Sequence, residues 1–114
     1  MDKLAEDGII LEQNYVQPAC TPSRSALMTG MYPYHIGRQV GVLEPNAPTG
    51  LTLEKKLLPE ALKEVGYDTH LVGKWHLGFC KEAYLPTERG FDTFYGFWAG
   101  SQDYINKTVG TVRE

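Results

Sequence analysis

A chain of 114 residues, 42% of them hydrophobic, has room for one domain with a modest core. Its formal net charge of -3 offers no basic surface for nucleic acid or for an anionic membrane. No apolar run approaches the length of a membrane span, and residues 1–6 have neither the basic nor the apolar part of a secretory signal.

The first two predicted elements are a helix end and a strand. Residues 2–7 form the end of a helix that Gly8 terminates. In residues 9–16 the apolar side chains run together instead of alternating, which indicates a strand covered on both faces of a largely parallel sheet. Ligand sites form outside the carboxyl ends of such strands, and this strand leads to Cys20.

A short helix is predicted over residues 23–29. Thr21 can cap it, Pro22 has the fixed φ of a first helical turn, and Gly30 can close it in a left-handed conformation. Cys20 would then lie just before a helix N-terminus, where free backbone N–H groups favour an anion or a developing negative charge.

Glycine and proline residues punctuate positions 32–51 and predict a long surface loop, which in a compact domain usually serves a site. A helix is expected over 59–65, ended by Gly66, and a strand over 67–72. The apolar face predicted for this helix comprises Leu58, Ala61, Leu62 and Val65. This order of elements indicates an α/β fold with parallel strands.

The last third of the chain carries weaker signals. An aromatic cluster there is expected to pack mainly as core, and its members are Phe91, Phe94, Tyr95, Phe97 and Trp98. Trp75 is expected to be a packing residue, and His35 and His70 are expected to be structural or exposed. Asn106 begins the sequence Asn-Lys-Thr, an acceptor for N-glycosylation that is also common by chance.

Two motifs in the chain resemble those of one family. Residues 20–24, Cys-Thr-Pro-Ser-Arg, resemble the modification signature of the type I sulfatases, in which the cysteine is oxidised to formylglycine. Residues 66–78, which end in Gly-Lys-Trp-His-Leu-Gly, resemble the second sulfatase signature, and residues 89–96 resemble the segment that follows it. The resemblance covers nearly the whole chain and is closest to the arylsulfatase B-like (N-acetylgalactosamine-4-sulfatase-like) branch.

The resemblance implies a fold and an extent. The fold would be the alkaline-phosphatase-like fold of the sulfatases, a mostly parallel sheet flanked by helices. A sulfatase catalytic domain is several times longer than this chain, so we interpret residues 1–114 as part of the N-terminal catalytic domain, incomplete at both ends. Its parallel strands would lack neighbours and present open edges, so the isolated chain is expected to fold poorly and to be inactive.

The resemblance also implies a sulfuric ester hydrolase whose nucleophile is the hydrated formylglycine made from Cys20. One hydroxyl of the hydrate attacks sulfur, and loss of the proton from the other expels sulfate. Cys20, as formylglycine, would also give one oxygen to a bound calcium ion, whose other ligands lie outside the chain. Arg24 matches the arginine that holds the hydrate, Lys74 the lysine that contacts sulfate, and His76 the histidine that handles or orients the hydrate's proton.

The implied partners are a sulfated glycan or aryl sulfate substrate and the formylglycine-generating enzyme. Since that enzyme acts in the endoplasmic reticulum of eukaryotes, the full-length protein is expected to be lysosomal or secreted. The arylsulfatase B-like branch implies a sulfated N-acetylgalactosamine in a glycosaminoglycan as substrate. Relatives in this branch carry further cysteines near Asn46, Gly50 and Tyr84, where this chain has none, and modification of Cys20 would leave Cys80 without a partner.

Two other functions are alternatives to this one. A cysteine-dependent phosphatase also places a cysteine before a helix N-terminus, but its arginine lies further on than Arg24 does, and Pro22 lacks the N–H that a phosphate-binding loop needs. A non-catalytic fragment or pseudo-enzyme, with at most sulfated-glycan binding, is favoured by the missing metal ligands. Retention of the cysteine, arginine, lysine and histidine of both signatures favours a catalytic parent protein.

Overall fold

The longest helix among the described residues begins at Cys20 and continues until Gly30 ends it. The computed structural model describes residues 1–109 and 112–113. Its α-helices are α1 (Asp2–Asp7), α2 (Cys20–Thr29) and α3 (Leu58–Glu64), and its 3-10 helices span Pro33–Ile36, Glu82–Tyr84 and Pro86–Arg89. Its strands are β1 (His70–Lys74), β2 (Thr93–Phe97), β3 (Thr108–Val109) and β4 (Val112–Arg113).

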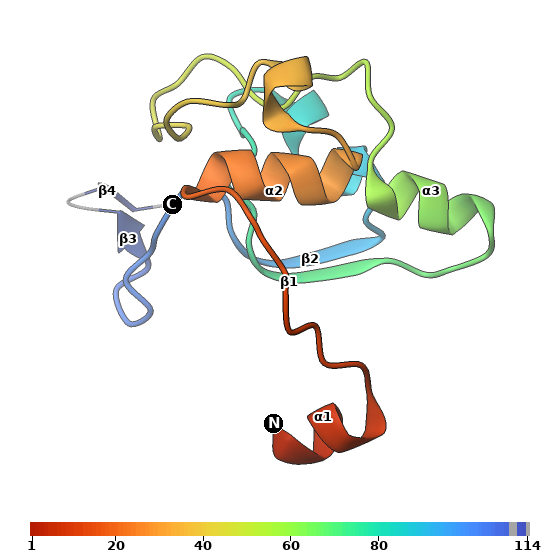
Figure 1. Cartoon of the computed structure of the whole chain (residues 1–114). Coiled ribbons are helices and arrows are strands. Elements are labelled where there is room, and N and C mark those ends of the chain that lie inside the picture. The colour runs from red at the N-terminus through yellow and green to blue at the C-terminus, as the bar shows by residue number, and fades with distance from the viewer. Residues whose placement is uncertain (110–111, 114) are drawn as a thin grey trace.

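Two strands that are parallel and far apart in sequence form the main sheet. β1 pairs with β2 in a register that sets His70 opposite Thr93 and Lys74 opposite Phe97. β3 and β4 form a separate antiparallel pair. Figure 1 shows α2 lying over the β1–β2 sheet, with α3 near the start of β1. Parallel strands and flanking helices confirm the predicted α/β class.

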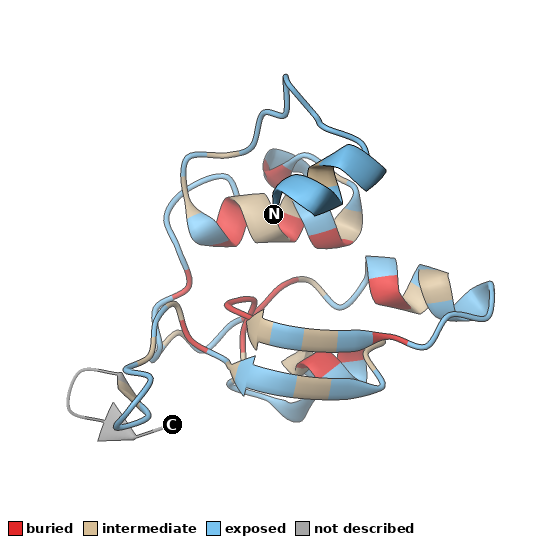
Figure 2. Ribbon diagram, turned by 90° about the horizontal axis from the view of Figure 1, so that it is seen from below, coloured by how far each residue is buried: buried red, intermediate tan, exposed pale blue. Residues whose placement is uncertain are grey.

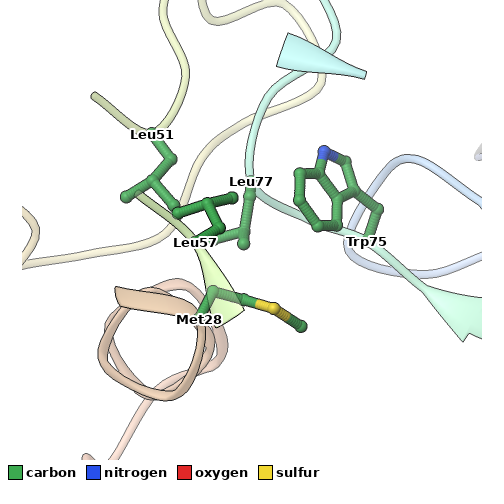
Figure 3. Close-up of a cluster of buried hydrophobic side chains, with 5 residues drawn as sticks. All are labelled: Met28, Leu51, Leu57, Trp75 and Leu77. Carbon is green, nitrogen blue, oxygen red and sulfur yellow. The ribbon is translucent and has the colours of Figure 1, made fainter. Parts of the chain in front are cut away.

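A small hydrophobic core lies between α2 and the segment that follows β1. Its buried members are Met28, Leu51, Leu57, Trp75 and Leu77. Figure 3 shows the Met28 side chain of α2 turned toward the other members of this cluster. Trp75 has 0% of its surface exposed, and its Nε1–H donates to the carbonyl oxygens of Gly78 and Tyr84, each at 3.0 Å. The prediction that Trp75 is a packing residue is therefore confirmed.

The helix over residues 2–7 is confirmed, but the strand predicted over 9–16 is wrong. Residues 9–16 form no strand, and the side chains of Ile9 and Tyr15 are 89% and 86% exposed. Figure 1 shows this segment and α1 extending away from the rest of the molecule. A continuous apolar run predicts burial only when other elements cover it, and the described residues supply no such cover.

The second predicted strand starts later than expected. α3 ends at Glu64, one residue before its predicted end, and the Tyr67 N–H still donates to the Leu62 carbonyl at 3.1 Å. Residues 65–67 therefore complete the helix exit instead of beginning a strand. β1 starts at His70, three residues later than predicted, and ends at Lys74.

The apolar face predicted for α3 is also wrong. Leu58 is 45% exposed and Val65 is 71% exposed, whereas Leu57 and Pro59 are buried. Leu57 belongs to the core although it lies at the N-cap of the helix. The start of α3 therefore contributes to the buried core, and the rest of the helix does not.

β2 is a strand that the sequence did not predict, and its aromatic residues divide between two faces. Phe94 and the preceding Phe91 pack against the core. Tyr95 is 79% exposed, and Phe97 makes an edge contact with Tyr104 at 6.4 Å between ring centroids. Figure 2 shows exposed residues along both strands. The core assignment therefore holds for only part of the aromatic cluster, because side chains alternate between faces along a strand.

The predicted long loop over 32–51 is confirmed, apart from the 3-10 helix at its start, and its end is held tightly against the segment after β1. The Leu51 N–H donates to the Leu77 carbonyl at 2.7 Å. Gly78 has φ +108°, and a Cβ atom placed on it would lie 2.4 Å from the Gly50 Cα. A Cβ atom on Gly50 would in turn lie 2.6 Å from the ring of Tyr84. Glycine is required where these backbones meet.

Candidate functional site

The helix that carries the first motif begins at Cys20 itself, three residues before its predicted start. Ala19 is the N-cap and makes no side-chain cap bond, and the Ser23 N–H donates to its carbonyl at 3.2 Å. Gly30 closes the helix with φ +67°, as predicted. The cap predicted at Thr21 is wrong, because this residue lies inside the helix and is buried.

The Thr21 hydroxyl joins three segments that are distant in sequence. Its Oγ1 accepts a hydrogen bond from the Leu43 N–H at 3.0 Å. It also donates to the carbonyl oxygen of His76 at 3.4 Å, a long contact for a hydroxyl donor. The first turn of α2 is therefore tied to the long loop and to the segment that follows β1.

Arg24 reaches from the next turn of α2 to the end of β1. Its Nε donates to the Trp75 carbonyl at 2.6 Å, and its Nη2 donates to the Lys74 carbonyl. Burial lowers the pKa of Arg24, and the nearby charge of an ionised Cys20 opposes that effect. Nη1 makes no hydrogen bond within the described residues, so this part of the guanidinium can still meet an anion.

Cys20 is exposed and faces two cations. A hydrogen bond from the Lys74 side chain is the main reason that the pKa of the Cys20 thiol lies below its ordinary value. The charges of Lys74 and Arg24 and the Cys20 backbone N–H act in the same direction, while partial burial opposes them. The start of α2 and the end of β1 thus form a positively charged site around the Cys20 side chain.

His76 follows β1 directly and is held in an uncommon conformation. It is 4% exposed and has φ +57°, a left-handed conformation that residues with a side chain seldom adopt. Its N–H donates to the Trp98 carbonyl at 2.9 Å. Its ring Nε2 lies 2.8 Å from the Leu43 carbonyl, and because a carbonyl only accepts, Nε2 carries the proton.

The other ring nitrogen of His76 is left as an acceptor. Nδ1 is buried and has no hydrogen-bond partner among the residues that the structure describes. Burial is the main cause that lowers the pKa of His76, with the charges of Lys74 and Arg24 adding to it and the Leu43 hydrogen bond and Glu44 opposing it. The neutral imidazole with a free Nδ1 lone pair is therefore the favoured form near neutral pH.

The structure brings four of the predicted site residues to one end of the sheet. They are Cys20, Arg24, Lys74 and His76, and the charges of the arginine and the lysine act on both the cysteine and the histidine. Asn106 lies elsewhere, exposed in the turn before β3. His35 and His70 are exposed, as expected, and Cys80 is an exposed free cysteine.

Two participants were missed from the sequence. Thr21 was interpreted as a helix cap, and nothing singled out Leu43 in the long loop. Leu43 acts through its peptide N–H and carbonyl, so its side chain gives no sequence signal.

The described residues do not by themselves fit a calcium ion. Such an ion takes about six to eight oxygen ligands, mostly from carboxylates and carbonyls. The side chains that act on Cys20 are instead a guanidinium and an ammonium group. Among residues 1–109 and 112–113, no group of three or more His, Cys, Asp and Glu side chains could hold a metal ion. Cys20 could supply one ligand, as an oxygen-bearing derivative.

The helices of the described residues are all too short or too polar to cross a lipid bilayer.

Comparison with known proteins identifies the class to which this fold and site belong. The family model described as Sulfatase matches residues 1–113. The chain belongs to the sulfatase family.

Curated relatives are much longer than this chain. Arylsulfatase J of Mus musculus is 56% identical over 104 residues, which cover 91% of this chain and 17% of the relative. Arylsulfatase A of Homo sapiens is 45% identical over 98 residues, covering 84% and 19%. N-acetylgalactosamine-6-sulfatase of Homo sapiens is 38% identical over 104 residues, covering 84% and 20%. The chain thus spans about a fifth of the length of these relatives.

Solved structures agree on the fold. Ps i-CgsB, in a complex with k-i-k-neocarrahexaose, superposes with a TM-score of 0.72 at 40% identity, over 77% of this chain and 19% of that one. PsFucS1 sulfatase from Pseudoalteromonas sp. gives 0.68 at 41% identity, over 90% and 20%. These similarities confirm that the α/β fold is the alkaline-phosphatase-like fold of the sulfatases.

Proposed function

We propose that the full-length protein that contains this chain hydrolyses sulfate esters. The observation that carries the proposal is the arrangement of Lys74 and Arg24 around an exposed Cys20 at the first turn of a helix. Two cations and free helix N–H groups suit an anionic sulfate group. Membership of the sulfatase family supports the same chemistry and argues against the cysteine-dependent phosphatase.

Each site residue has a role in this proposal. Cys20 is converted to formylglycine, whose hydrated aldehyde supplies an oxygen nucleophile that can be regenerated after sulfate leaves. Lys74 binds a sulfate oxygen. Arg24 fixes the backbone of Lys74 through Nη2 and offers Nη1 to negative charge beside the nucleophile. His76 accepts a proton at its free Nδ1.

Several partners of the reaction lie outside the described residues. The calcium ion would take one oxygen from modified Cys20 and its other ligands from the rest of the full-length protein, of which residues 1–114 form part of the N-terminal catalytic domain. The formylglycine-generating enzyme would act during maturation, which implies passage through the secretory pathway to a lysosomal or secreted location. The exposed Asn106 would then be open to glycosylation.

The proposed substrate is a sulfated glycan, with a sulfated N-acetylgalactosamine of a glycosaminoglycan as the first candidate and simple aryl sulfates as the alternative. The names of two relatives support a sugar, since one is an N-acetylgalactosamine-6-sulfatase and the other was solved with neocarrahexaose. Activity of the purified full-length protein on a sulfated N-acetylgalactosamine and on an aryl sulfate distinguishes the two.

Mass spectrometry of the peptide that contains Cys20 tests the proposed nucleophile. The protein is purified from its own cells, and the peptide with Cys80 serves as the internal control. Conversion to formylglycine lowers the mass of the Cys20 peptide by about 18 units, whereas ordinary thiol oxidation adds oxygen mass. A Cys20 peptide found only as thiol would refute the proposed mechanism.

A non-catalytic function is the second candidate, because the described residues contain no group of three or more His, Cys, Asp and Glu side chains that could hold a metal ion. In that case the protein would keep the fold and at most bind sulfated glycans through Lys74 and Arg24. Formylglycine in the Cys20 peptide together with sulfate release excludes this candidate, and binding without sulfate release supports it.

A further inference from the structure

His76 is the site residue whose conformation most needs support from its surroundings. A left-handed backbone is unfavourable for a residue with a side chain, and it persists only where neighbouring contacts determine it. Three hydrogen bonds meet at this residue in the structure. Its N–H donates to Trp98, its carbonyl accepts from Thr21, and its ring Nε2 donates to Leu43.

Two of these three hydrogen bonds depend on one hydroxyl. Thr21 Oγ1 contacts the His76 carbonyl directly, and it also accepts the N–H of Leu43, whose carbonyl receives the ring proton of His76. The contact to the His76 carbonyl is long at 3.4 Å, so the bond to Leu43 at 3.0 Å is the stronger of the two. Thr21 and Leu43 are 2% and 8% exposed, so no solvent replaces the bond when it is lost.

We propose that Thr21 is a positioning residue that holds His76, through the Leu43 peptide, with Nε2 protonated and Nδ1 as the free acceptor. Its catalytic consequence rests on the proposed function, because only a reaction at Cys20 makes use of that acceptor. The support that Thr21 gives to His76 concerns only the residues of this chain and does not depend on the proposed function. The hydroxyl is the group that matters, since the methyl group of Thr21 makes neither bond.

Three variants of the full-length protein separate the hydroxyl from the shape of the side chain. Thr21→Val keeps the shape and removes the hydroxyl, Thr21→Ser keeps the hydroxyl, and Thr21→Ala removes the hydroxyl without adding bulk if the valine variant does not fold. The first readout is carbethoxylation of each histidine by diethylpyrocarbonate, followed by mass spectrometry. The exposed His35 and His70 are internal controls for reagent and fold.

The labelling experiment needs neither formylglycine nor activity. We expect His76 to be protected in the unchanged protein and in Thr21→Ser, and to react at least several times faster in Thr21→Val or Thr21→Ala, while His35 and His70 react equally in all of them. Equal protection of His76 in every variant overturns the proposal. Faster labelling in Thr21→Ser as well overturns it too, because the methyl group would then be the supporting feature.

The second readout is the rate of sulfate release per formylglycine, with the formylglycine content measured by mass spectrometry because Thr21 lies within the modification motif. Loss of the hydroxyl should lower kcat roughly tenfold, because His76 would no longer be held in place through the Leu43 peptide. KM should change little, because Lys74 is untouched. If the unchanged protein releases no sulfate, the proposed function fails while the labelling result still decides the role of Thr21.

Discussion

The Arg24 Nε donates to the carbonyl oxygen of Trp75 at 2.6 Å, so a helix residue fixes the peptide that follows β1. A second N–H of the same guanidinium holds the Lys74 carbonyl. The helix that carries Cys20 and the strand that carries Lys74 therefore share one anchor. The sequence alone indicates only an electrostatic role for Arg24, but Arg24 also fixes the peptides at the end of β1.

Replacing Arg24 by lysine tests this double role. An ammonium group keeps the charge but cannot span two successive carbonyls in the planar geometry of a guanidinium. We expect Arg24→Lys to lower kcat per formylglycine roughly 100-fold, equivalent to about 2.7 kcal/mol. Arg38→Lys is the matched control, since Arg38 bonds the long loop and not β1. Near-normal kcat in Arg24→Lys would show that charge alone suffices.

Lys74 is expected to control the ionisation of unmodified Cys20. The Lys74 hydrogen bond favours the thiolate and lowers the thiol pKa, so Lys74→Met should move that pKa upward, toward its ordinary value. The measurement is the pH dependence of alkylation of the Cys20 peptide in protein made without the modifying enzyme. Lys81→Met, at an exposed lysine outside the site, should leave the profile unchanged. An unshifted profile in Lys74→Met would contradict the geometry described above.

Asp92 is expected to make stability depend on acid pH. Its pKa is lowered from 3.8 to about 2, first by Lys63 and then by the backbone and side chain of Thr69. Because the carboxylate binds its proton less readily in the folded protein, the stabilisation is complete above about pH 4 and is lost as the pH falls toward 2.

Thermal unfolding between pH 2 and pH 6 tests the predicted contribution of Asp92 to stability. Asp92→Asn should lower the Tm at pH 6 and reduce its fall at lower pH, whereas Glu88→Gln, at an exposed carboxylate nearby, should follow the unchanged protein. Parallel Tm curves for all three proteins would refute the role of Asp92.

Arg89 is expected to be a major stabilising residue although it lies away from the site. It is 3% exposed, and its guanidinium donates to the carbonyls of Leu51, Thr52 and Lys55. Arg89→Met leaves these carbonyls without a donor and should cost about 3 kcal/mol of unfolding free energy. Arg89→Lys should recover part of it. Denaturant unfolding measures both, and a loss below about 1 kcal/mol in Arg89→Met would contradict the prediction.

The chemical motifs were predictable because their meaning depends on residue type and spacing. The local sequence correctly indicates that Arg24 lies on a helix and that Lys74 and His76 lie at a strand end, but it places Cys20 before the helix, whereas the helix begins at Cys20. Residues 9–16 were not predictable as an irregular segment, since an apolar run has the same appearance whether or not other elements cover it. Pairing of β1 with β2 depends on contacts between residues far apart in sequence. The role of Leu43 involves only its backbone N–H and carbonyl, which a pattern of side chains in the sequence does not indicate.

The packing of the Tyr84 ring against Gly50 has a consequence for how the long loop responds to its chemical environment. The loop, residues 32–51, contains no cysteine. The loop that holds His76 is therefore retained by contact area and hydrogen bonds, and not by a covalent link. Thiol reductants should leave that attachment intact, because it contains no disulfide bond that they could reduce.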